Sequence, residues 1–329
     1  MRSVFSLNLT DKQQSYHGSP STCGGSDEDV FSKAEWFNDQ FLKVAFLSKP
    51  DSTIHAIFIL TFCIIIVGIV GNGYVVWLLG FCIKRNKFTI YVLNLAIADL
   101  GMLIGSLAFS VPLFNTELKV ANVQKIQWFF WQFALCSYSV GLYLLTAIGV
   151  ERCLCILFPI WARCHRPKQL SITVSVLSWI VSALFCITEF LLHYFCLLDL
   201  WVTFIRIMFG INLFILTPVM VISTLILFIK ISFRHQSGKL HTIILIILIF
   251  FIITAIPYGT FFFVSTINYN FHSIAVPVFS LLVILNSSIN SIIYFFVGIQ
   301  CNCRSFESIK DVFQRIFKDE TEHAETIMT

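Results

Sequence analysis

The chain has 329 residues, of which 57% are hydrophobic, 35 are Phe and only 12% are charged, with a formal net charge of +4. So much apolar surface does not fit inside one water-soluble core. The composition therefore excludes a soluble globular protein and predicts an integral membrane protein. We expect no nucleic-acid partner for such a chain.

A polar amino-terminal tail is predicted for residues 1–50, where acidic and basic side chains are mixed. The tail shows no apolar stretch led by Lys or Arg, so no cleavable signal peptide is expected. Asn8 begins the tail's one Asn-Leu-Thr acceptor for glycosylation, which is usable only if this end lies outside the cell.

Apolar segments long enough to cross a bilayer, which takes about 20 residues, follow the tail. They lie at 51–84, 88–114, 126–150, 169–194 and 207–229, with two more inside 240–303. The last run has 64 residues without a formal charge, too many for one crossing. The polar cluster from Asn268 to Ser273 divides it. We therefore predict an all-α, seven-helix transmembrane bundle over residues 51–300.

Basic residues in the predicted loops orient this bundle. One set of alternating connections, including the carboxyl-terminal tail, carries fourteen Lys and Arg, whereas the other set carries three. Basic loops stay in the cytoplasm, so the richer set is expected there and the amino terminus outside.

An amphipathic helix on the inner membrane surface is predicted for residues 301–318, where Phe and Ile recur at three- and four-residue spacing. Cys301 and Cys303, just before it, are candidates for palmitoylation, and unmodified thiols are the alternative. Residues 319–329 form the predicted cytoplasmic tail.

Glu151 and Arg152 stand side by side where the third apolar run ends. Charges at the edge of a bilayer are costly unless they pair or reach water. We expect Glu151 to restrain Arg152 in one conformation and to release it in another. The alternative is that Arg152, like Arg166, only marks a cytoplasmic loop.

The sequence Glu-Arg-Cys-Leu-Cys-Ile-Leu-Phe-Pro-Ile-Trp-Ala-Arg-Cys-His-Arg-Pro begins at Glu151. It resembles the third-helix end and second cytoplasmic loop of rhodopsin-like G-protein-coupled receptors, and more narrowly those of the Mas-related branch. Further matches lie in the other spans, at Gly71, Asn72, Asn94 to Asp99, Trp179 and Pro218. The resemblance implies a plasma-membrane receptor that activates a heterotrimeric G protein.

The resemblance assigns a coupling and switch role to Glu151, Arg152, Pro257, Asn290 and Tyr294. Span six would tilt about Pro257, and Arg152 would then meet the carboxyl-terminal helix of a Gα subunit. The chain departs from the family where Ser291 replaces the proline of Asn-Pro-x-x-Tyr. It also departs in span six, which has no tryptophan two residues before Pro257.

Asp99 lies near the middle of span two, so it is expected to face the bundle interior near Asn72, Asn286 or Asn290. In the family this cluster resembles a Na+ site. Gly141 stands where the family places a serine ligand, so a protonated or water-bound structural aspartate is an equal alternative.

Glu189 lies near the outer end of span four, where Mas-related receptors are expected to meet cationic ligand groups. One carboxylate in a low-dielectric cleft attracts a basic group strongly. Arg206 falls where some relatives carry a second acid, so a Glu189 to Arg206 pair without a ligand is the alternative. Ala134, where amine receptors carry an aspartate, argues against a biogenic amine.

The family's common extracellular disulfide cannot form, because Gln127 replaces its third-helix cysteine. Of the 11 cysteines, Cys23 and Cys196 are the two placed clearly outside by the predicted topology. A bridge between Cys23 and Cys196 is the hypothesis that follows.

These observations predict a receptor for peptides or small cations, in contact with membrane lipid, rather than an enzyme. An orphan or constitutively active receptor is the alternative. A transporter is disfavoured because no internal repeat is present. No catalytic or metal-binding motif stands out.

Overall fold

A computed structural model describes residues 52–82, 86–110, 120–195, 197–233, 239–267 and 275–300, and its regular structure there is helical. The first helices are α3 (Ser52–Trp77), a π-helical turn (Leu78–Cys82), α4 (Lys87–Ser110), α5 (Val120–Leu157) and the short α6 (Pro159–Cys164). The remaining ones are α7 (Leu170–Tyr194), α8 (Leu198–Ile211), a second π-helical turn (Asn212–Leu216), α9 (Thr217–Phe233), α10 (Lys239–Ser265) and α11 (Ala275–Gln300).

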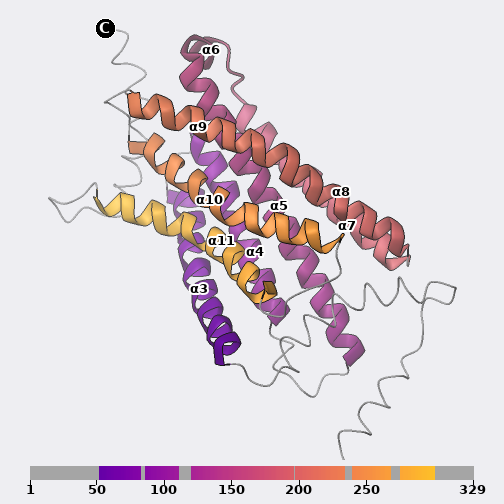
Figure 1. Cartoon of the computed structure of the whole chain (residues 1–329). Coiled ribbons are helices and arrows are strands. Elements are labelled where there is room, and N and C mark those ends of the chain that lie inside the picture. Colours follow the sequence, from indigo (N-terminus) through magenta and orange to yellow (C-terminus); the bar gives the residue numbers. More distant parts are fainter. Residues whose placement is uncertain are drawn as a thin grey trace, which may run out of the picture.

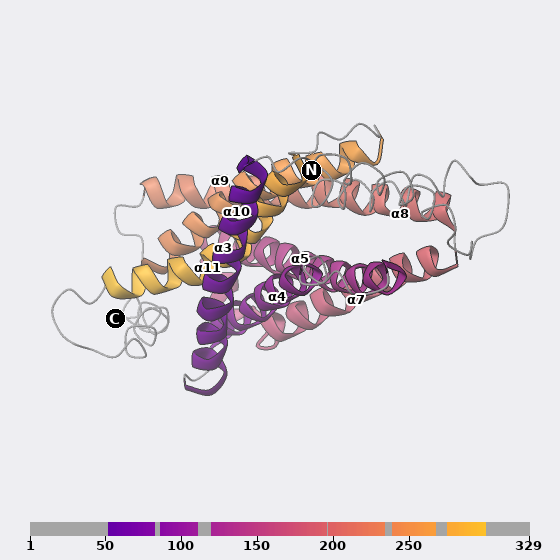
Figure 2. The same ribbon diagram turned by 90° about the horizontal axis from the view of Figure 1, so that it is seen from below.

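Seven long helices pack into one bundle when α8, the second π-helical turn and α9 are taken as one continuous helix (Figure 1, and from below in Figure 2). Six of them are long and apolar enough to cross a membrane over the described residues. In the seventh, α11, the described apolar stretch is the shorter Pro277–Ile293. The predicted seven-helix class is confirmed. The predicted segments 1–50, 301–318 and 319–329 lie outside the described residues.

Two boundaries differ from the prediction. The fifth crossing begins at Leu198 rather than near residue 207, because Asp199 and Arg206 are accommodated within the helix. The connection after α5 contains the helix α6, which lies at one end of the bundle (Figure 1). The predicted division of the long apolar run is placed well, since α10 ends at Ser265 and α11 begins at Ala275.

Apolar side chains cover the outside of the bundle, and many small and polar side chains lie at the helix contacts inside it. Ile59 and Phe81 on α3 and its extension are 66% and 82% exposed. The buried face of α7 consists of Ser171, Ser175, Ser178, Ser182 and Glu189. In a bilayer the hydrophobic effect does not drive helices together, so small and polar residues take the contact positions.

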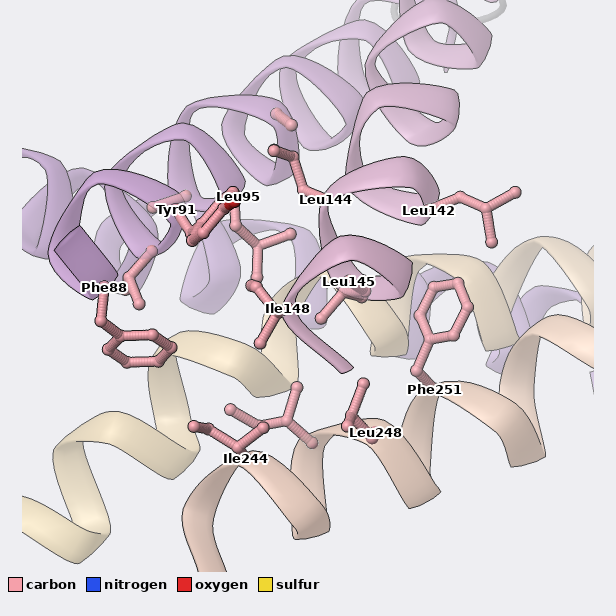
Figure 3. Close-up of a cluster of buried hydrophobic side chains, with 14 of the residues drawn as sticks. Phe88, Tyr91, Leu95, Leu142, Leu144, Leu145, Ile148, Ile244, Leu248 and Phe251 are labelled. Carbon is pink, nitrogen blue, oxygen red and sulfur yellow. The ribbon is translucent and has the colours of Figure 1, made fainter. Parts of the chain in front are cut away.

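A large apolar cluster fills the part of the bundle between the start of α4, the end of α5 and the start of α10. Figure 3 shows its members, among them Phe88, Tyr91, Leu95, Leu145, Ile148, Ile244 and Leu248. Dispersion contacts of these close-packed side chains hold the three helices together. The cluster thereby fixes the end of α5 that carries Glu151 and Arg152.

Prolines interrupt the hydrogen bonding of two helices. Pro218 follows the second π-helical turn, in which the N–H of Thr217 donates to the carbonyl of Asn212, and the Thr217 hydroxyl donates to the same oxygen at 2.9 Å. Pro257 lies inside α10 and removes one backbone donor there. Span six therefore lacks one backbone hydrogen bond at the position where it is predicted to bend.

A side-chain hydrogen bond ties α7 to α4, because Trp179 Nε1 donates to Asn94 Oδ1 at 3.1 Å. Trp179→Phe keeps an aromatic ring but removes the donor, so the free energy of unfolding should fall by about 1 kcal/mol. Thermal unfolding in detergent measures the loss. If Asn94→Leu destabilised the wild type and Trp179→Phe by the same amount, the hydrogen bond would not contribute to stability.

Candidate functional site

Buried polar side chains gather at opposite ends of the bundle. We call one the Glu189 end, defined by Glu189 and Gln132, and the other the Arg152 end, defined by Arg152 and Glu151. Gln132 lies near the start of the long helix α5, and Glu151 and Arg152 lie near its end. One helix therefore spans both sites.

Glu189 is buried where α5, α7 and α8 meet. Its side chain is 1% exposed, and Oε2 has no hydrogen-bond partner among the described residues. Gln132 of α5 and Trp201 of α8 lie next to the carboxylate. Both amide atoms of Gln132 and the indole Nε1 of Trp201 are likewise buried without a partner in the described part of the chain. Three helices thus bring polar side chains together around one buried carboxylate.

Aromatic rings stand beside this carboxylate. The rings of Trp128 and His193 are stacked, with centroids 4.2 Å apart and an interplanar angle of 22°. The centroid of the Trp201 ring lies 5.8 Å from that of Trp128 and 5.6 Å from that of His193. His193 and Glu189 are one helical turn apart on α7, which places them on the same face. An acid with aromatic neighbours is an arrangement that attracts cations.

Arg206 does not neutralise Glu189. Its Nη2 donates to the backbone oxygen of Thr266 at 2.6 Å, which ties α8 to the end of α10, and its buried Nε has no partner among the described residues. The Glu189 to Arg206 pair, expected as the alternative to ligand binding, is therefore not formed in this structure. Arg206 and Trp201 lie on different faces of α8, since Arg206 points towards the end of α10 and Trp201 points towards α7.

The Arg152 end contains an ion pair that differs from the expected one. Arg166 donates to Glu151 Oε1 through Nη2 at 2.6 Å and through Nε at 2.9 Å, and its Nη2 also lies 2.7 Å from Ser171 Oγ. The two charged side chains are 3% and 12% exposed. We call this group of Glu151, Arg166 and Ser171 the loop clasp, because it fastens the connection after α6 to α5 and α7.

Arg152 packs against α4. It is 7% exposed, and its guanidinium carbon lies 4.4 Å from the centre of the Phe88 ring. Consecutive residues on a helix diverge by about 100°, so Glu151 and Arg152 face different neighbours. Glu151 thus pairs with Arg166, while Arg152 contacts the Phe88 ring of α4, and the restraint of Arg152 by Glu151 stays a prediction.

We call Asp99, Asn72, Asn286 and Asn290 the Asp99 cluster. Its hydrogen bonds join three helices to α11. Asn290 Nδ2 donates to Asp99 Oδ2 at 2.8 Å, and Asn72 Nδ2 donates to the backbone oxygen of Ser287 at 2.9 Å. The hydroxyl of Thr254 lies 3.2 Å from Asn286 Oδ1. Helices α4, α3 and α10 are each joined to α11 by one of these bonds.

Several predicted positions are not tested by this geometry. Tyr294 belongs to α11, but its side chain lies outside the described residues, as do Asn8, Cys23, Cys301 and Cys303. Cys196 is also outside them, so its bridge to Cys23 stays a prediction.

Sequence reasoning missed three partners that the fold supplies. Arg166 was counted only as a loop charge, and Gln132 and Trp201 were not singled out. An amide inside an otherwise apolar run was the signal available for Gln132, since polar groups within the membrane usually serve packing or function. Nothing in the sequence placed Trp201 beside Glu189, because the two lie on different helices.

Comparisons with known proteins agree with this architecture. Residues 71–294 match the family of the 7 transmembrane receptor (rhodopsin family). The chain is 38% identical to the human (Homo sapiens) proto-oncogene Mas over 271 residues, which is 77% of this chain and 81% of that protein. It is 34% identical to the Mas-related G-protein coupled receptor member D of Macaca fascicularis over 282 residues, covering 78% and 82% of the two chains.

The seven-helix bundle and these matches define a multi-pass membrane receptor of the rhodopsin family. Within that family the chain belongs to the Mas-related G-protein-coupled receptors. Its relatives are receptors and not enzymes, which agrees with the non-enzymatic class expected from the sequence.

Proposed function

We propose that this protein is a plasma-membrane receptor whose Glu189 end binds a cationic group of a peptide or small ligand and whose Arg152 end activates a heterotrimeric G protein. The observation that carries the ligand site is the buried carboxylate of Glu189, whose Oε2 has no partner among the described residues. A buried charge without a partner is costly, and a cation from outside would compensate it.

The orientation follows from the loop charges. The connections on the Arg152 side hold most of the fourteen basic residues of the richer set, which places that end in the cytoplasm and Glu189 outside. On the cytoplasmic side, Phe158 and Ile160 are 57% and 74% exposed next to the loop clasp. They offer an apolar docking surface to a Gα subunit.

Activation is a population shift between two packings of the bundle. A ligand that binds one packing better moves the equilibrium only by that difference in affinity. Movement of α10 at Pro257 would change the contacts of its cytoplasmic half with α5. Arg152 would then exchange its contact with Phe88 for a contact with the G protein.

Sensors that report dissociation of Gα from Gβγ test this function in cells, with a panel of basic peptides and every Gα class. Arg152→Ala should abolish activation, and Glu189→Gln should raise the peptide concentration needed by about tenfold or more, because it removes the charge and keeps the shape. Asp199→Asn removes an exposed acid on α8 and serves as the control for long-range attraction.

Two outcomes would contradict the proposal. Equal potency on the wild type and Glu189→Gln would remove the ligand site from this carboxylate. Signalling without any peptide, lost only in Arg152→Ala, would instead identify a constitutively active receptor.

We also propose that the Asp99 cluster holds Na+. Asp99, Asn286 and Asn290 offer the carboxylate and amide oxygens that hard cations prefer. At Gly141 the nearest atom to an added Cβ is Leu95 Cδ1 at 3.9 Å, so no oxygen is supplied from that side. The protein side of the Na+ site would therefore come from α4 and α11.

Replacing choline chloride by NaCl at constant ionic strength should raise the thermal unfolding temperature of the purified receptor. An ion that binds only the folded state stabilises that state. Asp99→Asn should remove the difference. An equal response in Asp99→Asn and in the wild type would mean that Na+ acts elsewhere.

A further inference from the structure

Two cysteines of neighbouring helices meet near the Glu189 end. Cys136 lies on α5 and Cys186 on α7, and their thiol groups lie next to each other. Cys136 follows Gln132 by four residues, about one helical turn, and Cys186 precedes Glu189 by three. The thiol pair therefore belongs to the same contact between α5 and α7 that places Gln132 beside the buried carboxylate.

A second contact places the Cys186 thiol against α5. Cys186 Sγ lies 3.9 Å from the backbone oxygen of Gln132. In an α-helix the carbonyl of a residue accepts a hydrogen bond from the N–H four residues later, so the oxygen of Gln132 points towards the backbone of Cys136. A thiol that lies at this oxygen is necessarily close to Cys136. Two separate contacts thus bring the two cysteines together.

The contact face of α7 allows a close approach of the helices. Ser182, four residues before Cys186, is 0% exposed, and Ser178, four residues earlier again, is also buried. Small side chains at a helix contact in the membrane let the two backbones come near each other. A disulfide needs such nearness, because it joins Cα atoms that are at most about 7 Å apart.

We propose that Cys136 and Cys186 form a reversible disulfide, which joins α5 to α7 and is closed by a peroxide. Both thiols are free in this structure and only half-buried, so a small oxidant can reach them. The loop charges place the Glu189 end outside the cell, where thiols are not kept reduced. This proposal does not depend on a ligand at Glu189.

Hydrogen peroxide supplies the oxidising equivalents. One cysteine attacks a peroxide oxygen as its thiolate, the O–O bond breaks, and a sulfenic acid and hydroxide form. The hydroxide takes up the proton that this thiol released, which gives the first water. The second cysteine then attacks the sulfenic sulfur, and the S–S bond forms as the second water leaves with the remaining thiol proton. Two thiols lose two electrons, and one peroxide becomes two waters.

The disulfide would change what α5 and α7 can do. In the reduced protein, non-covalent contacts hold this part of the two helices together. A disulfide would fix Gln132 and Glu189 relative to each other and would restrict sliding of α7 along α5. Thiol–disulfide exchange with a reductant reverses the step, so the mobility of this contact depends on the redox state outside the cell.

The test uses the full-length receptor in lipid nanodiscs. The protein is reduced with dithiothreitol, freed of it, treated with hydrogen peroxide, blocked with N-ethylmaleimide and digested for mass spectrometry. The peptide pair that joins Cys136 to Cys186 should increase at least ~tenfold over the untreated sample, because the fold holds the two thiols together. Dithiothreitol added after the peroxide should remove it.

The same digest contains two matched controls. Cys153 and Cys155 lie only two residues apart on α5, but residues at this spacing face different directions on a helix, so they should not be joined. Cys63 is exposed on α3 and should be blocked by N-ethylmaleimide rather than joined to another described cysteine. Linked peptides from these cysteines in equal yield would show unselective oxidation and would overturn the proposal.

Thermal unfolding, followed by tryptophan fluorescence, gives a second reading. Peroxide should raise the unfolding temperature of the wild type by about 5 °C or more, since a cross-link restricts the unfolded chain. Cys136→Ala and Cys186→Ala should each lose this rise, whereas Cys153→Ala should keep it. An equal rise in Cys186→Ala, or the absence of the linked peptide from the oxidised wild type, would mean that the two thiols are only a packing contact.

Discussion

Arg166→Met should lower the free energy of unfolding by about 3 kcal/mol, because it leaves the carboxylate of Glu151 without its cation. The pair is nearly closed to solvent, with side chains 3% and 12% exposed, and Glu151 Oε2 already has no partner among the described residues. Removing one partner of such a pair costs more than the pair itself contributes. Heating the detergent-solubilised receptor and following the folded fraction by size-exclusion fluorescence measures the loss.

The double variant Arg166→Met with Glu151→Gln is the informative partner. Once the carboxylate is neutral, the loss of its cation costs little, so the double variant should be more stable than Arg166→Met alone. Lys168→Met, an exposed cation two positions along the same connection, is the matched control and should change little. Losses that simply add in the double variant would show that the loop clasp has no coupling energy.

The loop clasp also has a consequence for signalling. It holds the connection that carries Phe158 and Ile160, so the proposed docking surface is fixed relative to α5 before a G protein arrives. Hydrogen exchange of residues 158–169 should accelerate in Arg166→Met, since a tethered segment opens less often. Unchanged exchange there would mean that α6 is held by its apolar contacts alone.

Gly105→Leu should prevent the receptor from reaching the cell surface in folded form. A Cβ added at Gly105 would lie 3.0 Å from the backbone nitrogen and 3.1 Å from the Cα of Ala134. These are backbone atoms of α5, so no rotation of a side chain relieves the contact, and α4 must separate from α5. The pair α4 and α5 has the most extensive contact in the described bundle, which makes the separation costly.

Gly73 provides the control for this substitution. It also lies inside a membrane helix, α3, but a Cβ added there meets no atom within 4 Å. Gly73→Leu should therefore retain surface expression, measured by antibody labelling of intact cells, while Gly105→Leu loses most of it. Comparable expression of the two variants would show that α4 and α5 tolerate a wider spacing.

Hydropathy and the family resemblance predicted the helices and their order along the chain. Six apolar runs, separated by loop charges, predicted the crossings and their order, and the polar cluster that divides the run 240–303 falls between the end of α10 and the start of α11. Asp99, a charged side chain in an apolar run, was expected to face the bundle interior and is buried there. Both results follow from transfer free energies, which depend on composition along the chain.

The partners of those side chains were predicted less well. Adjacency drew attention to Glu151 and Arg152, but it did not indicate that Arg166 pairs with Glu151 or that the Phe88 ring lies beside Arg152. The proximity of opposite charges suggested a pair of Glu189 and Arg206, yet Arg206 donates to Thr266. A pairing depends on the rotation of each helix about its axis, and rotation is fixed by contacts between residues far apart in sequence.

The class of this protein follows from the amino-acid sequence alone, because enough apolar residues per crossing and an uneven distribution of basic loops leave few arrangements for a chain in a bilayer. The partners of the buried polar groups depend on how the helices pack. The loop clasp closes because α5, α6 and α7 meet at one end, and Oε2 of Glu189 is left without a partner among the described residues where α5, α7 and α8 meet at the other. Hydrogen bonds form over about 3 Å, so they record helix rotation and spacing that hydropathy does not contain.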